Sequence, residues 1–116
     1  MPEDCIFCKI AKGNISTKKI YENDLFLSIP DVNPRIKGHS LIISKKHFDT
    51  VLDLPITLGG ELLDCIKNTS LKLIDEYHAS GFNLINNNFD SAGQVVNHFH
   101  MHILPRKEKD ALGSIF

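Results

Sequence analysis

The stretch His98–Leu104 reads HFHMHIL, and its alternation of histidine with apolar residues is typical of a β-strand. Successive side chains of a strand point to opposite faces of a sheet. The three histidines therefore share one face, and the face of Phe99, Met101 and Ile103 is expected to pack under a helix. The strand is expected to end at Pro105, which has no backbone N–H to donate.

The flanking sequence predicts a sheet covered by one long helix. Residues 61–77 carry apolar side chains at three- and four-residue steps, which indicates an amphipathic helix, and Gly81 is its expected stop. A short helix is expected over residues 5–12. Apolar or alternating runs predict four further strands, over residues 19–22, 25–30, 39–44 and 82–86. The expected class is α+β, with a mainly antiparallel sheet, one long helix and one or two short helices.

The length of 116 residues predicts one domain that covers residues 1–116. No apolar run approaches the roughly 20 residues of a membrane-spanning helix, and the first residues lack the features of a secretory signal. A cytoplasmic protein that acts without a membrane is therefore expected. The net charge of −1 and the absence of a dense Lys or Arg run argue against nucleic acid as a partner.

Three imidazoles on one strand face indicate a catalytic or ligand-binding role rather than a role in core packing. A core face would carry Val, Ile or Leu, and a solvated face would carry Thr, Lys or Glu. Such a row of imidazoles serves either a metal ion, which takes ligands from it, or an anionic phosphate, which meets one nucleophilic ring flanked by donors. The pattern alone leaves both possibilities open.

The segment AGQVVNHFHMHILPR at residues 92–106 resembles the signature of the histidine triad (HIT) family. Three more segments resemble that family in the same order and spacing: CIFCKI at residues 5–10, IPDVNPRIKGHSLIISKKH at 29–47 and GFNLINNN at 81–88. The likeness is closest to the small Hint-type and bacterial branch. It implies a five-stranded antiparallel sheet with one long helix, and a homodimer that shares one continuous sheet.

The resemblance also implies a nucleotide hydrolase or transferase. Members of the family bind purine nucleotides and cleave at the α-phosphate, commonly of adenosine phosphoramidates, through a nucleotidyl-histidine intermediate. His100 matches the nucleophile, His102 a residue near the phosphate and leaving group, and His39 a residue near the α-phosphate. A neutral imidazole suits the nucleophilic role because its pKa lies near ambient pH.

Substrate-binding residues are implied in the same way. Asp31 matches the residue that binds the ribose hydroxyls, and Val32 one that lies against the base. Val95 stands where the family usually has Ser or Thr, whose hydroxyl points toward the leaving group. Taken alone, Asp31 could equally stabilise a turn before Asn-Pro, and Asn87 could be an ordinary loop residue. Three residues match positions around the phosphate: Asn87, Gly93 and Gln94.

The pair Cys5 and Cys8 forms a Cys-x-x-Cys half-site typical of tetrahedral zinc, and His47 and His98 are candidates to complete it. In zinc-bearing bacterial HIT proteins the matching four positions bind the metal, so the resemblance implies a structural zinc site. A redox motif is disfavoured because no βαβ unit surrounds it. Cysteines that merely pack remain an alternative, and Cys65 is expected to be a small buried apolar residue.

Four functions are therefore weighed. The leading one is a purine nucleoside phosphoramidase acting on adenosine or guanosine phosphoramidates. A dinucleoside polyphosphate hydrolase and a weakly catalytic nucleotide-binding module that acts through partners are the alternatives within the resemblance. A histidine-rich metal carrier is the alternative from the residues alone.

Overall fold

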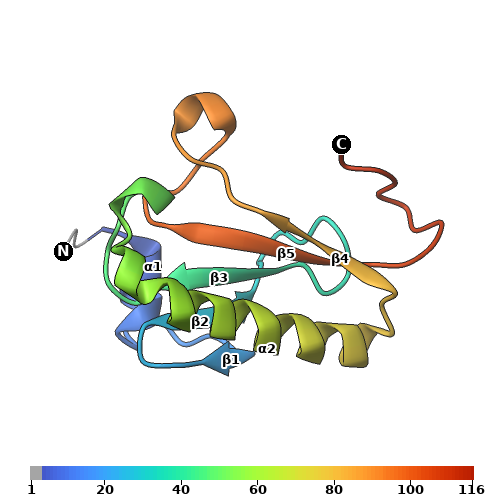
Figure 1. Ribbon diagram of the computed structural model, residues 1–116, viewed down its shortest axis with the longest axis horizontal. Helices are drawn as coiled ribbons and strands as arrows, with labels where there is room; N and C mark the ends of the chain where they lie inside the picture. Colours follow the sequence, from blue (N-terminus) through green and yellow to red (C-terminus); the bar gives the residue numbers. More distant parts are fainter. Residues whose placement is uncertain (1–3) are drawn as a thin grey trace.

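The computed structural model describes residues 4–116 and has the predicted α+β class. Its five strands form one antiparallel sheet in the order β1-β2-β3-β5-β4, with the α-helices α1 and α2 packed on it (Figure 1). The strands are β1 (Tyr21–Glu22), β2 (Phe26–Pro30), β3 (Ser40–Ser44), β4 (Gly81–Ile85) and β5 (His100–Arg106). The α-helices are α1 (Ile6–Ala11) and α2 (Gly59–Tyr77), and short 3-10 turns occupy Val51–Asp53, Ile56–Leu58 and Asp90–Ala92.

The two faces of the sheet carry different cores, as the alternation in β5 predicts. Helix α2 lies along one face (Figure 1), where its Cys65 and Leu73 pack with Phe99 and Ile103. The opposite face is covered in part by α1, whose apolar residues pack on β2 and β3. The side chains of this second core are Phe7, Ile10, Leu27, Ile29, Leu41 and Ile43.

Strand β3 lies at the centre of the sheet, between β2 and β5, and every residue of it is buried. Its run SLIIS has no clear polar face, as expected for a strand covered on both sides. Leu41 pairs with His102 and Ile43 with His100. The two histidines of β5 therefore project on the α1 side of the sheet, beside the second core and away from α2.

The predicted bounds of the histidine strand are wrong at both ends. The strand begins at His100, not at His98, and it continues through Pro105 to Arg106. Proline fits there because β3 ends its pairing at Ser40, which lies opposite Ile103. The backbone O of Arg106 accepts a hydrogen bond from Ser80 N, on the β4 side of β5. Backbone groups of consecutive strand residues point to opposite sides, so those of Pro105 point to the β3 side, where the pairing with β3 has already ended.

The predicted stop of the long helix at Gly81 is also wrong. The helix ends at Tyr77, and His78 is its C-cap in the left-handed conformation, with φ of 53° and its N–H donating to Ile74 O. Gly81 instead opens β4. A short turn after His78 is enough to reverse the chain, so glycine is not needed for this cap. No helix in residues 4–116 has the length and apolar character needed to span a bilayer.

Gly38 allows the chain to turn tightly into β3. Its φ is +92°, and a Cβ placed on it would lie 2.7 Å from Pro105 Cγ and 2.7 Å from Tyr77 Cδ2. We expect Gly38→Ala to lower the free energy of unfolding by about 2–4 kcal/mol, because left-handed strain and overpacking add together. Urea unfolding followed by circular dichroism measures this loss.

The matched control is Gly60→Ala in the first turn of α2, where an added Cβ meets nothing within 4 Å. Alanine has the higher helix propensity, so this variant is expected to be as stable as the wild type or more stable, by up to about 1 kcal/mol. Equal effects of the two substitutions would contradict the role assigned to Gly38.

Candidate functional site

Five of the six histidines form two groups, and His98 belongs to a different group from His100 and His102. His100 and His102 lie on β5, and His39 lies directly before β3. His98 precedes β5, and its ring lies 4.9 Å from that of His47. The alternation still holds at His98, because Phe7 of α1 packs against the rings of both His98 and His100, whereas Phe99 packs in the core under α2. His98 belongs with the cysteines.

The imidazole of His100 has a defined tautomer. Its Nδ1 lies 2.8 Å from the backbone O of His98. A carbonyl oxygen can only accept, so Nδ1 carries the proton and donates it. The lone pair of the neutral ring is therefore on Nε2. This is the nitrogen that an electrophile such as phosphorus would meet.

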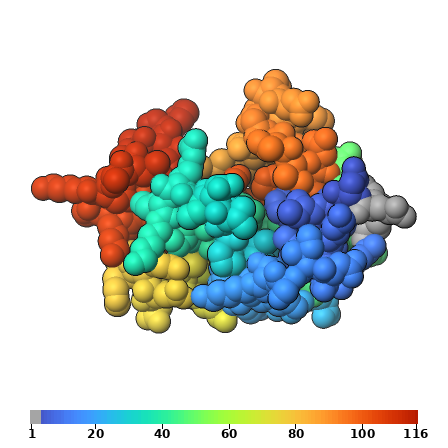
Figure 2. All heavy atoms as spheres, turned by 180° about the vertical axis from the view of Figure 1, so that it is seen from behind, coloured from blue at the N-terminus to red at the C-terminus, as the bar shows by residue number. Residues whose placement is uncertain are grey.

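The free nitrogen of His100 reaches solvent although the residue as a whole is buried, with 7% of its surface exposed. In residues 4–116, Ser70 Oγ is the single enclosed side-chain nitrogen or oxygen that lacks a hydrogen-bond partner. An Nε2 sealed in the interior would be a second one. The surface on this side is indented between the loop after β2 (cyan) and the loop after β4 (orange), with α1 (blue) beside them (Figure 2).

His39 and His102 form a hydrogen-bonded pair with the opposite tautomer. The backbone N–H of Arg35 donates to His39 Nδ1 at 3.0 Å, so the proton of neutral His39 is on Nε2. That Nε2 lies 2.9 Å from His102 Nδ1 and donates to it. The proton of neutral His102 is then on Nε2. Adjacent rings of β5 therefore present an acceptor nitrogen from His100 and a donor nitrogen from His102.

Burial keeps this pair neutral. It lowers the pKa of His39, an effect that the Asp31 carboxylate opposes and the Arg35 guanidinium reinforces. Burial, together with the neighbouring imidazoles of His100 and His39, lowers the pKa of His102 to about 4. At neutral pH both rings are uncharged, as the tautomer assignment requires.

Asp31 lies beside the pair and has two contacts. Its Oδ1 accepts the backbone N–H of Asn33 at 2.9 Å, which is the turn-forming contact expected of an Asp before Asn-Pro. Its Oδ2 lies 3.4 Å from His39 Nε2 and 3.9 Å from His102 Nδ1. The ligand atoms of these three side chains lie within 4.8 Å of one another, close enough to share a metal ion. The proton on His39 Nε2 disfavours that use, because a metal would displace it and Nδ1 already accepts from Arg35.

The loop after β4 contains Asn87, Gly93 and Gln94. Gly93 has φ of +89°, and a Cβ placed on it would lie 4.0 Å from Asn87 Nδ2, so these two residues are neighbours. The side chain of Gln94 holds the loop in shape. Its Oε1 accepts from Phe89 N at 2.7 Å, and its Nε2 donates to Asp49 O at 2.6 Å and to Val96 O at 3.1 Å.

Val32 and Val95 are open to solvent, with 90% and 89% of their surfaces exposed. Val32 follows Asp31 on the loop after β2, and Val95 follows Gln94 on the loop after β4. These loops border the indentation seen in Figure 2. Exposed apolar side chains at such positions can contact a bound ligand without moving core residues.

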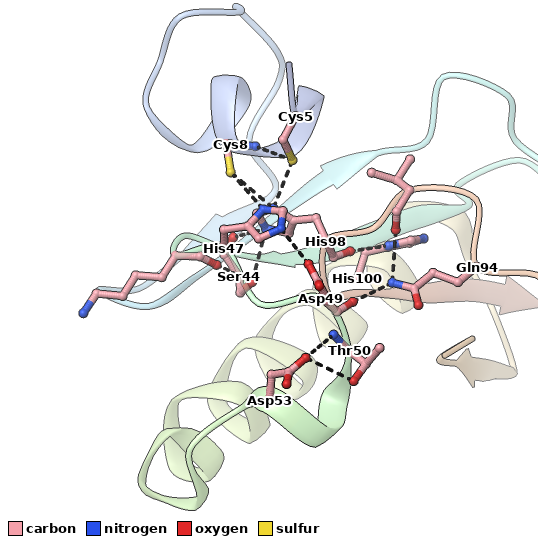
Figure 3. Close-up of polar contacts among 12 residues, drawn as sticks. Cys5, Cys8, Ser44, His47, Asp49, Thr50, Asp53, Gln94, His98 and His100 are labelled. Atoms are coloured by element: carbon pink, nitrogen blue, oxygen red, sulfur yellow. Dashed lines mark hydrogen bonds and ion pairs between the residues drawn. The ribbon is translucent and has the colours of Figure 1, made fainter. Parts of the chain in front are cut away.

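The second group of side chains is the cluster of Cys5, Cys8, His47 and His98, which could hold a metal ion. Both thiols come from the start of α1 and point toward the two imidazoles (Figure 3). Cys5 Sγ lies 3.3 Å from His98 Nδ1, and Cys8 Sγ lies 3.3 Å from His47 Nδ1 and 3.5 Å from His98 Nδ1. The two Nδ1 atoms are 3.2 Å apart.

These distances fit a tetrahedral ion. With Zn–N of about 2.0–2.1 Å and Zn–S of about 2.3 Å, tetrahedral ligands lie about 3.3–3.8 Å from one another. The tautomers fit as well. His98 Nε2 donates to Ser44 O at 2.7 Å and His47 Nε2 donates to Asp49 Oδ1 at 2.8 Å, which leaves both Nδ1 lone pairs facing the thiols.

The protein groups around the cluster disfavour a thiolate at Cys8 and a charged imidazole at His98. Burial, followed by the contact with Cys5, raises the pKa of the Cys8 thiol to about 11. Burial lowers the pKa of His98 to about 4, so its ring is neutral. A bound divalent cation would favour the thiolates and reverse the first of these shifts.

Several supporting residues were missed by sequence reasoning. Asn86 donates from Nδ2 to the backbone O of His100 at 3.0 Å, Ser44 accepts from His98, and Phe7 packs against the rings of His98 and His100. Asp49 could have been found, because a carboxylate two residues after a candidate ligand is a common orienting partner of a metal-bound histidine. The others act through contacts that only the fold creates.

Comparison with known proteins agrees with this geometry. The family model for the HIT domain matches residues 12–109, which include every strand of the sheet and the histidines of β5. The chain belongs to the HIT family. A HIT family protein from Bacillus subtilis has a solved structure that superposes with a TM-score of 0.89 at 38% identity, covering 98% of this chain and 82% of that one.

Two curated HIT relatives have names that state an activity. A protein named adenylylsulfatase HINT3 from Arabidopsis thaliana is 41% identical over 112 residues, which is 97% of this chain but only 57% of that relative's length. A protein named adenosine 5'-monophosphoramidase HNT1 from Candida albicans is 36% identical over 109 residues, covering 90% of this chain and 72% of the relative.

Proposed function

We propose that this HIT protein is a nucleotide hydrolase, and specifically a purine nucleoside phosphoramidase that cleaves adenosine or guanosine phosphoramidates at the α-phosphate. The observation that carries the proposal is the tautomer of His100, whose Nδ1–H donates to His98 O and thereby leaves the lone pair on Nε2. The relatives named for adenosine 5'-monophosphoramidase and adenylylsulfatase activity support a substrate with an adenylyl group.

The reaction proceeds in two displacements. His100 Nε2 attacks the α-phosphorus and forms an N–P bond, and the P–N bond of the substrate breaks with its electron pair going to the amine, which takes a proton from solvent. Water then attacks phosphorus, the electron pair of the N–P bond returns to Nε2, and the nucleoside monophosphate leaves with the proton balance made up by solvent. Each displacement has a lower activation barrier than the direct attack of water on the substrate.

His102 and His39 stabilise the charge that develops on the phosphoryl group. The Nε2–H of His102 donates to a phosphoryl oxygen, and His39 fixes that tautomer through the hydrogen bond of 2.9 Å between the two rings. Phosphoryl transfer depends mainly on positioning and charge stabilisation, and a fixed donor needs no reorganisation during the reaction.

Nucleotide-binding roles follow the positions of the loops. Asp31 accepts from the ribose hydroxyls, and the exposed Val32 lies against the base. Gly93 and Asn87 line the phosphate side, where Val95 offers no hydroxyl to the leaving group. Gln94 contributes indirectly, because its amide already bonds two backbone groups of the loop, Phe89 N and Val96 O, and the backbone O of Asp49. A nucleotide with one adenylyl or guanylyl group satisfies these contacts.

The decisive assay compares substrates on one enzyme preparation. We expect adenosine 5'-phosphoramidate to be turned over with a higher kcat/KM than diadenosine polyphosphates or adenylyl sulfate. A preference for diadenosine polyphosphates would make the protein a dinucleoside polyphosphate hydrolase. Nucleotide binding without turnover, and without an adenylylated His100 detected by mass spectrometry, would favour the binding module.

Zinc is the metal we propose for the cluster of Cys5, Cys8, His47 and His98. Two thiolates and two imidazoles in tetrahedral spacing are typical of structural zinc sites that leave no position open for substrate. Bound there, zinc would tie α1 to the sheet. A thiol-ligated site of this kind is compatible with a reducing compartment, which supports a cytoplasmic protein.

A homodimer is proposed through the outer edge of the sheet. Strand β4 lies at that edge, and its Phe82 and Leu84 expose 41% and 43% of their surfaces. An unpaired edge strand with exposed apolar side chains can continue the sheet into a second copy. Sedimentation of the purified chain measures the assembly state.

A pH prediction follows from the pair of His39 and His102. Since the folded pKa values lie below that of a free imidazole, near 6.5, the unfolded chain binds more protons between the two values. Stability contributed by the pair is therefore complete above about pH 6.5 and falls as the pH drops toward 4. The charged groups facing the pair are Asp31 and Arg35, with His100 beside them.

NMR titration of the ring Cε1–H signals tests this directly, with the same chain unfolded in urea as the reference. Both folded midpoints are expected below the urea value. A folded midpoint above the urea value for His102 would mean that the Asp31 carboxylate outweighs burial, and the tautomer chain would be incorrect.

A further inference from the structure

Helix α1 carries the two thiols of the metal cluster on either side of an aromatic residue, Phe7. The side chain of Phe7 is buried, and its ring centroid lies 5.7 Å from that of His98 and 5.1 Å from that of His100. The interplanar angles are 83° and 62°, an edge-to-face arrangement that is favourable for aromatic rings. The cluster and the proposed nucleophile therefore share a neighbour.

The position of Phe7 depends on how α1 is held. The helix has six residues, too few to be stable by themselves. Cys5 is its N-cap and accepts the backbone N–H of Cys8 through Sγ, so the same two residues that approach the imidazoles also define the first turn. A metal bound by both thiols would fix this turn against His47 and His98. Phe7 would be fixed with it.

The other contact that orients His100 also leads to the cluster. The acceptor of its Nδ1–H is the backbone O of His98, whose own ring lies between the thiols and Ser44 O. A metal on His98 Nδ1 would restrain that residue, and hence its carbonyl. Two groups contact the His100 ring: the carbonyl of His98 at Nδ1 and the aromatic ring of Phe7. The first belongs to a ligand of the metal cluster, and the second belongs to the residue next to the ligand Cys8.

We propose that Phe7 is a positioning residue for His100 and that the metal cluster acts on the nucleophile through it, together with the His98 carbonyl. Metal binding then holds the His100 ring in its single Nδ1–H tautomer with Nε2 directed at substrate. Metal loss would let α1 move and allow the ring to turn. This inference rests on the proposed role of His100, and its test includes a measurement that needs no substrate.

The test compares two substitutions in the same helix and the same core. Phe7→Leu keeps an apolar side chain but removes the ring, and Ile10→Ala is the matched control, because Ile10 is buried in the same cluster of apolar residues. Both are studied in protein loaded with Zn²⁺. Ring ¹⁵N shifts of His100 report its tautomer at a fixed pH of about 7.5, where histidine is mostly neutral.

In Phe7→Leu we expect the ¹⁵N shifts to move toward those of an averaged pair of tautomers. On adenosine 5'-phosphoramidate we expect kcat to fall about 10- to 100-fold, with KM changed less than about twofold, as misplacement of a reacting group predicts. Ile10→Ala should keep both the tautomer and kcat. Removing Zn²⁺ from the wild type with a chelator should reproduce the ¹⁵N change, and adding Zn²⁺ back should reverse it.

The proposal is overturned if Phe7→Leu keeps the Nδ1–H tautomer, or if Ile10→Ala changes tautomer and kcat as much as Phe7→Leu does. If chelation unfolds the chain, the two variants in loaded protein decide alone. A wild type that shows the expected ¹⁵N responses but no turnover of adenosine 5'-phosphoramidate supports the positioning role while refuting the proposed reaction, so the two failures are distinguishable.

Discussion

Replacing His100 by asparagine is expected to lower kcat on adenosine 5'-phosphoramidate by on the order of 10³-fold or more. Asparagine offers an amide N–H that can still donate to His98 O, but its side chain has no nitrogen lone pair with which to attack phosphorus. Nucleotide affinity, measured by calorimetry with AMP, should change little. Trapping with substrate should label the wild type at His100 and leave the variant unlabelled.

The matched control is His78→Asn on the C-cap of α2. His78 is exposed and has φ of 53°, a conformation that asparagine tolerates well, so stability and turnover should both be retained. Turnover by His100→Asn within about tenfold of the wild type would remove His100 from the nucleophile's role and with it the two-displacement reaction.

Loss of the metal is expected to have the largest effect on stability. At a free metal concentration of about 1,000 times its Kd, binding contributes about 4 kcal/mol to the free energy of unfolding. For a chain of 116 residues, chelation should then lower Tm by roughly 10–20 °C. Differential scanning calorimetry with and without a chelator measures this shift, and metal analysis after dialysis should give one zinc ion per chain.

Substitution of a ligand should have the same consequence. Cys8→Ser is expected to lose the metal and the chelator-sensitive part of Tm, whereas Cys65→Ala should keep the metal, because Cys65 is buried under α2 in the other core. His102→Gln should also retain it. Loss of metal in His102→Gln would favour a metal carrier that uses the histidines of β5, and a full zinc complement in Cys8→Ser would exclude the site.

Local patterns predicted the fold class because each element buries its apolar side chains at its own period. The three- and four-residue steps of residues 61–77 predicted an amphipathic helix on a sheet. The alternation in HFHMHIL predicted a strand with three imidazoles on one face. Ends of elements were less predictable. Pro105 continues β5 because its neighbour β3 has already stopped pairing, and the sequence near Pro105 contains no information about where β3 ends.

The motifs, read with the family resemblance, predicted both the residues of the site and the assignment of His98 to the metal cluster, and that cluster of four forms in the structure. His98 shares the sheet face of His100, since Phe7 packs against both rings. Its own ring nevertheless contacts Cys5 and Cys8, which lie about 90 positions earlier in the chain, at 3.3 Å and 3.5 Å.

By itself, the sequence determined the α+β class, the residue types available for phosphate chemistry and the Cys-x-x-Cys half of the metal cluster, since periodicity and side-chain chemistry are local properties. Tertiary structure alone decided which nitrogen of each imidazole carries the proton, because the deciding partners are backbone groups of other residues: His98 O for His100 and Arg35 N–H for His39. It also brought Phe7 against His100. Contacts between distant segments exist only after folding, so no reading of neighbouring residues could supply them.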